Sequence, residues 1–336
     1  MEMNARVTLC ALLACGEMSA IVLAAEQGAP VAATPVRIQL NWVPEPEFGG
    51  IYAAEELGLF TAAGLDVKII AGAAGVPVPQ MVASGTCEIG VVSGAQVLTT
   101  NGAGGDLVGF FATFQQNPTC VILRESMAPR TLREVWTGGF TVAVEDGLPW
   151  VAMANATFGS SNVRLVPYSG ALASFEADPK LIQQAFISAE PVQLALKGVA
   201  VRAISVAESG FNPYEAVYAT SRRYLDANPG AVAAFARAVQ AGWVAYQADP
   251  AKFNGILAPL NPAMSLEAMN LSAKTQTPLI ETDETRANGI GFMTQERWKQ
   301  TQDALLTTKI MKTPTEWQRA WTWLCASAPT SAGAAK

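Results

Sequence analysis

Residues 36–50 read VRIQLNWVPEPEFGG, a short apolar run that ends in a loop containing two prolines and two adjacent glycines. The pattern predicts a β-strand over residues 36–42 and a helix over residues 49–57 that is closed by Gly58. The prolines stiffen the loop, and the glycines allow its backbone to approach another group closely. We therefore expect an α/β fold with a functional loop after its first strand.

The alternation of strands and helices continues beyond this segment. Further strands are predicted at residues 65–71, 88–92, 107–114, 141–145, 163–168, 184–188, 202–206 and 214–220. Intervening helices are predicted at residues 77–83, 94–101, 149–158 and 191–197. Alternation of this kind indicates largely parallel sheets with helices on their faces.

Beyond residue 220 the sequence predicts helices only. Asn228-Pro229 and Asp249-Pro250 each place a capping side chain before a proline, which is typical of a helix start. Further helices are predicted near residues 266–274, 295–307 and 315–324, and residues 326–336 are expected to form a disordered tail. The C-terminal part is therefore expected to be helical.

The chain length and the order of elements predict two lobes. At 336 residues the chain exceeds the usual domain length of about 100–200 residues. We expect residues 36–122 and 212–325 to form the first lobe and residues 123–211 to form the second. Two chain crossings then act as a hinge, and a ligand site falls in the crevice between the lobes.

The N-terminal segment predicts export from the cytoplasm. Arg6 precedes an apolar stretch that is followed by polar, proline-bearing residues, the layout of a signal peptide. We expect cleavage of residues 1–24, and the alternative is a lipoprotein in which Cys15 carries the lipid. Either route predicts a periplasmic protein or one on the outer face of the cytoplasmic membrane.

The composition excludes several kinds of chemistry. The chain contains no histidine, so a Ser-His-Asp triad, a Cys-His pair and imidazole metal ligands are impossible. The formal net charge is −6 and no run of basic residues occurs, which argues against nucleic acid as a partner. Cys87, Cys120 and Cys325 have no CxxC spacing, and we expect Cys87 and Cys120 to be buried. We predict no metal site and no cofactor.

Several candidate ligand-binding residues follow predicted strands. Trp42 and Phe48 lie in the first loop, where each can stack on a flat ring or simply fill the floor between the lobes. Ser93 can face the crevice or only cap the helix that contains Gln96. The remaining candidates contribute an amide, an indole and a phenol, namely Gln115, Trp150 and Tyr168.

Glu190 is the most specific candidate. It follows a predicted strand and precedes Pro191, so its carboxylate lies at a helix start and is expected to face the crevice. A desolvated carboxylate needs hydrogen-bond donors, which the amine of a ligand or the edge of an aminopyrimidine supplies. The alternative is a glutamate that is favoured in the first helical turn by the helix dipole.

An ordered set of short segments resembles a known family. The segments are Leu40-Asn41-Trp42-Val43-Pro44-Glu45-Pro46, Gly58-Leu59-Phe60, Gly64-Leu65-Asp66-Val67, Ala83-Ser84-Gly85, Glu88-Ile89-Gly90-Val91, Gln115-Gln116-Asn117-Pro118, Ser188-Ala189-Glu190-Pro191 and Gly242-Trp243. Together they resemble the substrate-binding proteins of ABC importers over residues 36–324. The branch that binds thiamine pyrimidine precursors is the most similar, with nitrate, sulfonate and taurine binders as relatives.

The resemblance implies a type II periplasmic binding fold that closes on a small molecule and docks on a membrane permease. We expect a monomer. By the same resemblance, Trp42 and Glu190 match positions that stack on and hydrogen-bond to a pyrimidine. Phe48 departs from the pattern, because many relatives have a histidine there.

Three functional hypotheses follow. The first is a binding protein for a planar nitrogen heterocycle, such as a pyrimidine precursor of thiamine. The second is a binder of a sulfonate or nitrate, which requires an arginine such as Arg124 or Arg164 to balance Glu190. The third is an enzyme of pyrimidine synthesis, but fungal members of that kind consume a histidine and use a cysteine-rich iron motif, and this chain has neither. We therefore predict no catalytic residues.

Overall fold

The computed structural model describes residues 33–325, which form two five-stranded sheets and the helices that cover them. The predicted signal segment over residues 1–24, the alternative lipid site at Cys15 and the tail at residues 326–336 lie outside the described residues. Within residues 33–325, no helix combines the length and the apolar composition that a membrane span requires.

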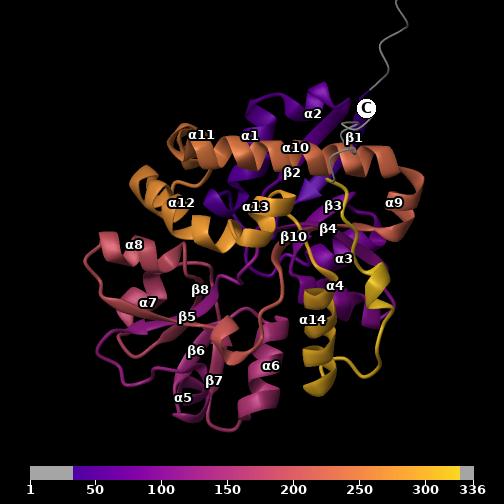
Figure 1. Ribbon diagram of the computed structural model, residues 1–336. Helices are drawn as coiled ribbons and strands as arrows, with labels where there is room; N and C mark the ends of the chain where they lie inside the picture. The colour runs from indigo at the N-terminus through magenta and orange to yellow at the C-terminus, as the bar shows by residue number, and fades with distance from the viewer. Residues whose placement is uncertain (1–32, 326–336) are drawn as a thin grey trace, which may run out of the picture. The chain divides into compact units, whose positions relative to one another are not determined.

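The first sheet has the strand order β2-β1-β3-β10-β4 (Figure 1). Its strands are β1 (Thr34–Gln39), β2 (Leu65–Ile70), β3 (Ile89–Val92), β4 (Leu107–Phe114) and β10 (Glu215–Ser221). β1 pairs in parallel with β2 and β3, whereas β10 is antiparallel to both β3 and β4. All strands except β10 therefore run in one direction, and their carboxyl ends meet at one edge.

The second sheet has the strand order β7-β6-β8-β5-β9. Its strands are β5 (Thr119–Arg124), β6 (Thr141–Val144), β7 (Arg164–Pro167), β8 (Ile182–Phe186) and β9 (Val201–Ser205). Here β5 is the antiparallel strand, because it pairs antiparallel with β8 and β9 while β6 pairs in parallel with β7 and β8. The predicted α/β class with largely parallel sheets is confirmed.

Two chain crossings connect the sheets. The first runs from β4 to β5 through residues 115–118, and the second runs from β9 to β10 through residues 206–214. Each crossing ends in the antiparallel strand of the sheet that it enters. Because β5 begins at Thr119, the second sheet starts before residue 122, where the first lobe is expected to end.

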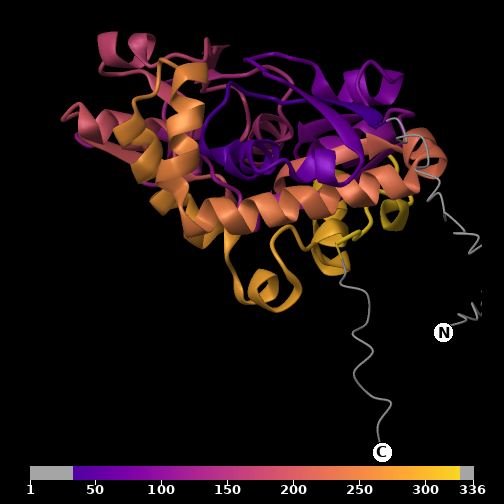
Figure 2. The same ribbon diagram turned by 90° about the horizontal axis from the view of Figure 1, so that it is seen from above.

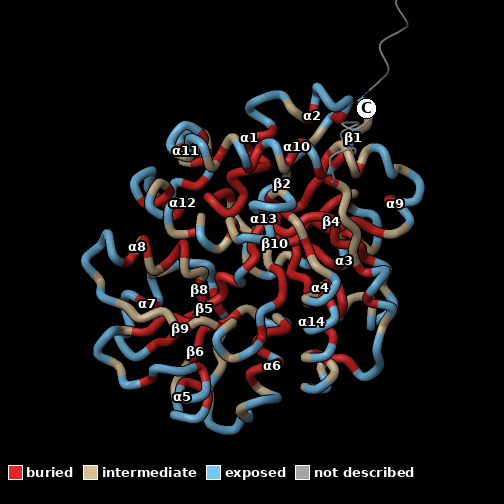
Figure 3. The backbone as a smooth tube through the Cα atoms, in the orientation of Figure 1, coloured by how far each residue is buried: buried red, intermediate tan, exposed pale blue. Residues whose placement is uncertain are grey.

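The helices cover the faces of the two sheets. Most have both buried residues and exposed residues, as the colouring of the backbone shows (Figure 3). They are α1 (Gly49–Glu56), α2 (Leu59–Ala62), α3 (Val78–Ser84), α4 (Gly94–Gly102), α5 (Leu132–Thr137), α6 (Pro149–Phe158), α7 (Ala173–Ala177), α8 (Glu190–Leu196), α9 (Arg222–Ala227), α10 (Pro229–Ala248), α11 (Pro250–Leu257), α12 (Leu266–Ile280), α13 (Asp283–Asn288) and α14 (Gln295–Thr307). Short 3-10 turns are η1 (Pro46–Phe48), η2 (Ala207–Ser209), η3 (Ala258–Leu260) and η4 (Trp317–Arg319). As predicted, α10 and α11 begin at Pro229 and Pro250, and Asp249 caps α11 by accepting from Lys252 N. The expected cap by Asn228 is wrong, because its side chain makes no capping hydrogen bond at α10.

The core of the first sheet depends on close packing of α10 against α1, which lie side by side in two views (Figures 1 and 2). Trp243 and Tyr246 of α10 are fully buried against Gly50 and Gly49, where an added Cβ would lie 2.3 and 2.4 Å from the aromatic rings. A Cβ on Gly242 would lie 2.1 Å from the carbonyl oxygen of Gly50. Small residues therefore allow the backbones of the two helices to touch.

The prediction of a helix at residues 315–324 is wrong. Only η4 is helical there, and Trp321 forms a parallel bridge with Gly109 of β4. Gly109 donates from its N to Ala320 O, and Thr322 donates from its N to Gly109 O, each at 2.9 Å. The segment thus covers the outer edge of β4, which would otherwise expose unpaired backbone groups.

The cysteines in the described chain are unpaired. Cys87 and Cys120 are 1% and 0% exposed, which confirms that they act as small buried hydrophobic residues. Cys325 is buried as well.

We predict that Gly242→Ala lowers the free energy of unfolding by about 1–3 kcal/mol, because the added methyl group forces α10 away from α1. Urea denaturation measures this change. Gly255→Ala in α11 is the matched control, since a Cβ there meets no atom within 4 Å. This control should stabilise the protein by up to about 1 kcal/mol, and equal effects of the two variants would contradict the packing explanation.

Candidate functional site

A cavity of about 340 Å³ lies where loops from both sheets meet. This volume is within the range of about 300–1,000 Å³ that is typical of small-molecule sites. Residues just beyond the carboxyl ends of parallel strands contribute to its wall, namely Trp42 after β1, Ser93 after β3, Glu145 after β6, Tyr168 after β7 and Glu190 after β8. This placement follows the rule that ligands bind at the carboxyl ends of strands in α/β folds.

Most of the residues predicted for the site line this cavity. They are Trp42, Ser93, Gln96, Trp150, Tyr168 and Glu190. Phe48 and Gln115 do not line it, and the structure gives a physical reason for each.

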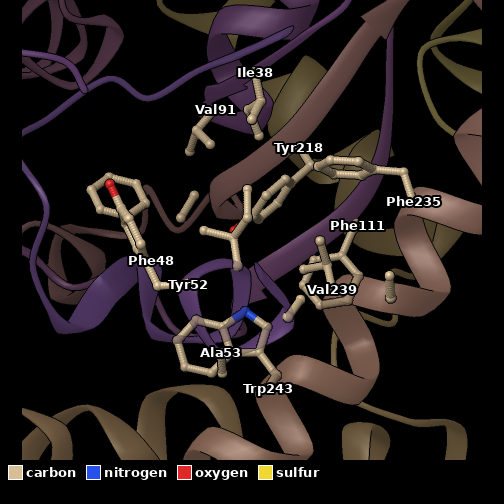
Figure 4. Close-up of a cluster of buried hydrophobic side chains, with 14 of the residues drawn as sticks. Ile38, Phe48, Tyr52, Ala53, Val91, Phe111, Tyr218, Phe235, Val239 and Trp243 are labelled. Atoms are coloured by element: carbon tan, nitrogen blue, oxygen red, sulfur yellow. The ribbon is translucent and has the colours of Figure 1, made fainter. Parts of the chain in front are cut away.

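Phe48 lies in the hydrophobic core with Tyr52 and Trp243 (Figure 4). Its side chain is 0% exposed, because η1 turns the chain directly into α1 and α1 packs tightly on α10. The expectation that Phe48 contacts a ligand is therefore corrected, because its ring packs in the hydrophobic core and does not line the cavity.

Gln115 points away from the cavity. Its Nε2 donates to the carbonyl oxygens of Ala112 and Phe292 at 3.1 and 3.0 Å, and its backbone N donates to Leu279 O at 2.8 Å. The amide thus anchors the first crossing to the C-terminal part of the chain, so the expectation that Gln115 binds a ligand is corrected.

Ser93 and Gln96 combine a structural role with a place in the cavity wall. Gln96 N donates to Ser93 Oγ at 3.1 Å, and Ser93 N donates to Gln96 Oε1 at 2.8 Å, which forms a capping box at the start of α4. Ser93 therefore does more than cap the helix, because it also lines the cavity, and its contact with a ligand stays a prediction.

Aromatic rings from both sheets meet at the cavity. Trp42 stacks on Tyr168 with ring centroids 5.8 Å apart and planes 6° apart. Gly170 lies against the Trp42 indole, where a Cβ would come within 3.0 Å, and its φ of +78° also favours glycine. Trp150 adds a third ring, and its buried Nε1 has no hydrogen-bond partner.

Glu190 is held by two donors within the protein. Tyr168 donates from its hydroxyl to Glu190 Oε1 at 2.8 Å, and Phe186 donates from its N to Glu190 Oε2 at 2.9 Å. Burial raises the pKa of Glu190, and these hydrogen bonds oppose the increase. Each carboxylate oxygen keeps a lone pair with which it can accept a further hydrogen bond from a ligand.

The sequence analysis missed a group of acidic side chains in the cavity wall. They are Glu45, Glu47, Glu145, Asp146 and Glu215. Glu45 and Glu47 lie in the same loop as Trp42, so their position after β1 was the signal that could have found them. Glu145 and Glu215 lie at the ends of predicted strands, where the sequence does not show which way a side chain points.

The surroundings of Glu45, Glu47 and Glu215 favour the protonated forms of these three carboxyl groups. Burial and then repulsion by Glu190 raise the pKa of Glu45 well above its usual range. Burial also raises the pKa of Glu47 well above its usual range, and repulsion by neighbouring carboxylates, of which Glu45 has the largest effect, raises it further. Burial raises the pKa of Glu215 to about 7, although Ala216 N and Asn117 donate hydrogen bonds to it.

No lysine or arginine is among the described residues that line the cavity. Arg124, one of the two arginines expected to balance Glu190 for an anion, donates instead to the carbonyl oxygens of Phe175 and Glu176 at 3.1 Å. Arg164, the other, lies on β7 and does not line the cavity. Among residues 33–325 no group of three or more His, Cys, Asp or Glu side chains is placed to hold a metal ion.

The two crossings are tied to each other beside the cavity. Asn117 N donates to Asn212 Oδ1 at 2.9 Å, and Asn117 Nδ2 donates to Glu215 Oε2 at 3.1 Å. Arg297 of α14 donates from Nε to Asn212 O at 2.9 Å and from Nη1 to Gln115 O. A carboxylate of the cavity wall is thus linked through Asn117 to the two crossings.

The comparison with protein-family models gives one match, to the family described as NMT1/THI5 like, over residues 45–253. The chain belongs to the NMT1/THI5-like family. This membership confirms the resemblance stated from the sequence. No curated protein matches the chain.

Solved structures show the same fold. The alkanesulfonate-binding protein SsuA from Xanthomonas axonopodis pv. citri, bound to MOPS, is 14% identical with a TM-score of 0.67, covering 87% of this chain and 99% of SsuA. A Candida albicans protein described as having the generic periplasmic binding protein fold is 12% identical with a TM-score of 0.62, covering 88% and 99%. The desulfurization enzyme DSZB is 16% identical with a TM-score of 0.57, covering 86% and 96%. The predicted periplasmic binding fold is confirmed.

We predict that the unliganded protein loses stability as pH rises from about 4 to above 7. Since the pKa of Glu215 is raised to about 7 in the folded state, its stabilising contribution is complete below the unfolded pKa of about 4.3 and is lost as pH rises through 7. This contribution to the free energy of unfolding is on the order of 3 kcal/mol. Urea denaturation at a series of pH values measures it. Glu215→Gln should make the profile less steep without abolishing it, because Glu45, Glu47 and Glu190 also have raised pKa values, whereas the exposed Glu56→Gln should leave it unchanged. A flat profile in the unsubstituted protein would contradict the assigned burial.

Proposed function

We propose that this protein is an exported solute-binding protein that captures a small planar nitrogen heterocycle, a pyrimidine precursor of thiamine or a similar ring, and delivers it to an ABC importer. The observation that carries this proposal is the composition of the cavity wall, which combines aromatic rings with carboxylates and has no basic side chain among the described lining residues. Membership of the NMT1/THI5-like family supports the proposal.

The aromatic residues supply a surface for a flat ring. Trp42 and Tyr168 already stack with nearly parallel planes, and a ligand ring can extend this stack or enter it when the loops separate. A stacked aromatic pair contributes about 0.5–1.5 kcal/mol beyond the area that it buries. Trp150 adds a third aromatic side chain to the cavity wall.

The carboxylates supply acceptors for the N–H groups of such a ring. Glu190 is fixed by Tyr168 and Phe186, so its remaining lone pairs have a defined direction. A site that is built to accept hydrogen bonds from a ligand rejects analogues without donors, because its buried polar groups are then left unpaired. This geometry suits the amino edge of an aminopyrimidine.

A sulfonate or nitrate fits this cavity poorly. SsuA binds alkanesulfonates, but an anion needs positive charge or several N–H donors, and the cavity wall here presents acidic groups. Catalysis is likewise not favoured, since no cysteine is among the described residues that line the cavity and the chain has no histidine. We therefore propose a binding protein rather than an enzyme.

We propose that the two sheets mark the two lobes, with the first boundary near residue 118 instead of 122. Two contacts cross the cavity from one sheet's loops to the other's. Gly75 donates from its N to Glu145 Oε1 at 2.7 Å, and Trp42 stacks on Tyr168. These contacts must break for a ligand to enter and re-form around it, and the closed form would then dock on a permease.

A monomeric state remains a prediction.

A thermal-shift screen against aminopyrimidines, flavins, alkanesulfonates and nitrate tests this function. A ligand at 100 times its dissociation constant stabilises a protein by about 2.7 kcal/mol, which raises Tm measurably. We expect a shift with the nitrogen heterocycles alone. A shift confined to sulfonates or nitrate would overturn the proposal.

We predict that Trp42→Ala weakens aminopyrimidine binding by about tenfold while the protein stays folded, because the ring loses its stacking surface. Isothermal titration calorimetry measures the affinity. Trp323→Ala is the matched control, since Trp323 packs edge-on against Phe292 and does not line the cavity. Equal affinity of Trp42→Ala and the unsubstituted protein would remove Trp42 from the site.

We predict that Glu190→Gln lowers the affinity for an amino-bearing ring by about 1.5–3 kcal/mol, the scale of a hydrogen bond to a charged group. The amide keeps the shape of the side chain and can still accept from Phe186 N. The exposed Glu56→Gln, which makes the same change in net charge, should bind normally. No loss with Glu190→Gln would support the alternative in which Glu190 only begins α8.

A further inference from the structure

We propose that the cavity selects a positively charged organic solute and that the positive charge of this solute lies against Glu45 and Glu47. This inference rests on the proposed function, because it specifies the charge of the ring that the same site binds. The carboxylates that carry it are separate from Glu190, which accepts hydrogen bonds from Tyr168 and Phe186.

The first observation is the position of the two side chains. Glu45 and Glu47 are 6% and 5% exposed, and both line the cavity. Burying an ionised carboxylate is costly unless it is paired or hydrogen-bonded. Two such groups in one loop therefore become ionised only when a compensating partner is present.

The second observation is that the described chain provides no such partner. The structure gives neither the Glu45 nor the Glu47 side chain a hydrogen bond or an ion pair within residues 33–325. The contrast with their neighbours is clear. Glu145 accepts from Gly75 N and Gln184 Nε2, and Glu215 accepts from Asn117.

The two carboxylates are also not needed to shape their loop. The turn η1 is closed by the backbone, since Phe48 donates from its N to Glu45 O at 2.9 Å. Gln276 of α12 donates to Pro46 O at 2.8 Å and fixes the turn from the other side. Two side chains that the fold does not use, buried at a cavity wall, are best explained by a ligand.

The chemistry of the wall indicates an organic cation. Ammonium, amidinium and protonated aminopyrimidine groups carry several N–H donors, and carboxylates accept these bonds with charge assistance. Trp42 and Tyr168 add aromatic faces that attract organic cations. A single planar ring with a cationic nitrogen group satisfies both features.

Three probes with the same aromatic ring but different charges separate the contribution of the charge from that of the ring. Benzamidine is a cation, benzamide is its neutral counterpart, and benzenesulfonate is an anion. We expect calorimetry at pH 8 to show that benzamidine binds at least about tenfold more tightly than benzamide and that benzenesulfonate does not bind.

Glu47→Gln tests the assigned carboxylate, with Glu56→Gln as the control that makes the same change in net charge on the exposed side of α1. We expect Glu47→Gln to reduce benzamidine affinity about tenfold and to leave benzamide affinity unchanged. An equal loss for both probes would show a structural role and overturn the inference. If Glu47→Gln fails to fold, Glu45→Gln provides the same comparison.

The pH dependence provides a test that needs no variant. Burial and repulsion raise the pKa of both carboxyl groups, so protons leave when a cation binds. We expect the ratio of benzamidine affinity to benzamide affinity to decrease as the pH is lowered from 8 to 5. The other titratable side chains that line the same cavity are Glu145, Asp146, Tyr168, Glu190 and Glu215.

The outcomes distinguish this inference from the function on which it rests. Benzamide that binds as tightly as benzamidine, or an aminopyrimidine that binds without benzamidine doing so, would overturn the charge assignment and leave the proposed function intact. Benzenesulfonate as the sole ligand, or no binding by any ring including the aminopyrimidine, would overturn both. Binding of magnesium or calcium without binding of benzamidine would show that the site takes a metal ion, and would overturn the assignment of an organic cation.

Discussion

The burial of several carboxylates around one cavity is the constraint on which the other features of the site depend. Glu45, Glu47 and Glu190 are each at least nine-tenths buried, and burial raises the pKa of all three. Repulsion by Glu190 raises the pKa of Glu45 and Glu47 further. A core of apolar side chains at the same place would be more stable, because unpaired buried charge opposes folding. The fold tolerates the arrangement because these carboxyl groups lie in loops and turns that follow the strands, while the contact of α1 with α10 remains apolar and tightly packed.

The same arrangement links ligand binding to the geometry of the two sheets. The cavity wall takes Trp42, Glu45 and Glu47 from one sheet's loops and Tyr168 and Glu190 from the other's. Under the proposed function, a ligand that neutralises these carboxylates would remove repulsion between the two sides and so favour a closed arrangement. The Asn117 contact with Glu215 extends this link to the crossings, where Arg297 joins both.

Much of this architecture could be predicted from the sequence because it depends on local patterns. Proline and capping residues located α10 and α11, and apolar runs located most strands within a residue or two. The segment 315–324 was misread because its tryptophans fit a helix, whereas the open edge of β4, which no local pattern reveals, decides its conformation. The strand β5 was not predicted separately for a similar reason, since its role depends on pairing with distant strands.

The candidate site shows the same division. Trp42, Tyr168 and Glu190 could be predicted because each follows a strand. Phe48 was assigned to the site because it shares the loop with Trp42, but the close packing of α1 draws its ring into the core. Glu45 and Glu47 were overlooked because their importance lies in the absence of partners, which only three-dimensional contacts reveal.

A crystal structure of the protein with a bound aminopyrimidine tests the central claim most directly, namely that acidic and aromatic groups bind the nitrogen edge and face of a planar solute. We predict that the ring contacts Trp42 and that its amino group lies within hydrogen-bond distance of Glu190 or of the Glu45 and Glu47 carboxylates. A ring bound elsewhere, or an anion held in this cavity by groups other than these, would contradict the account.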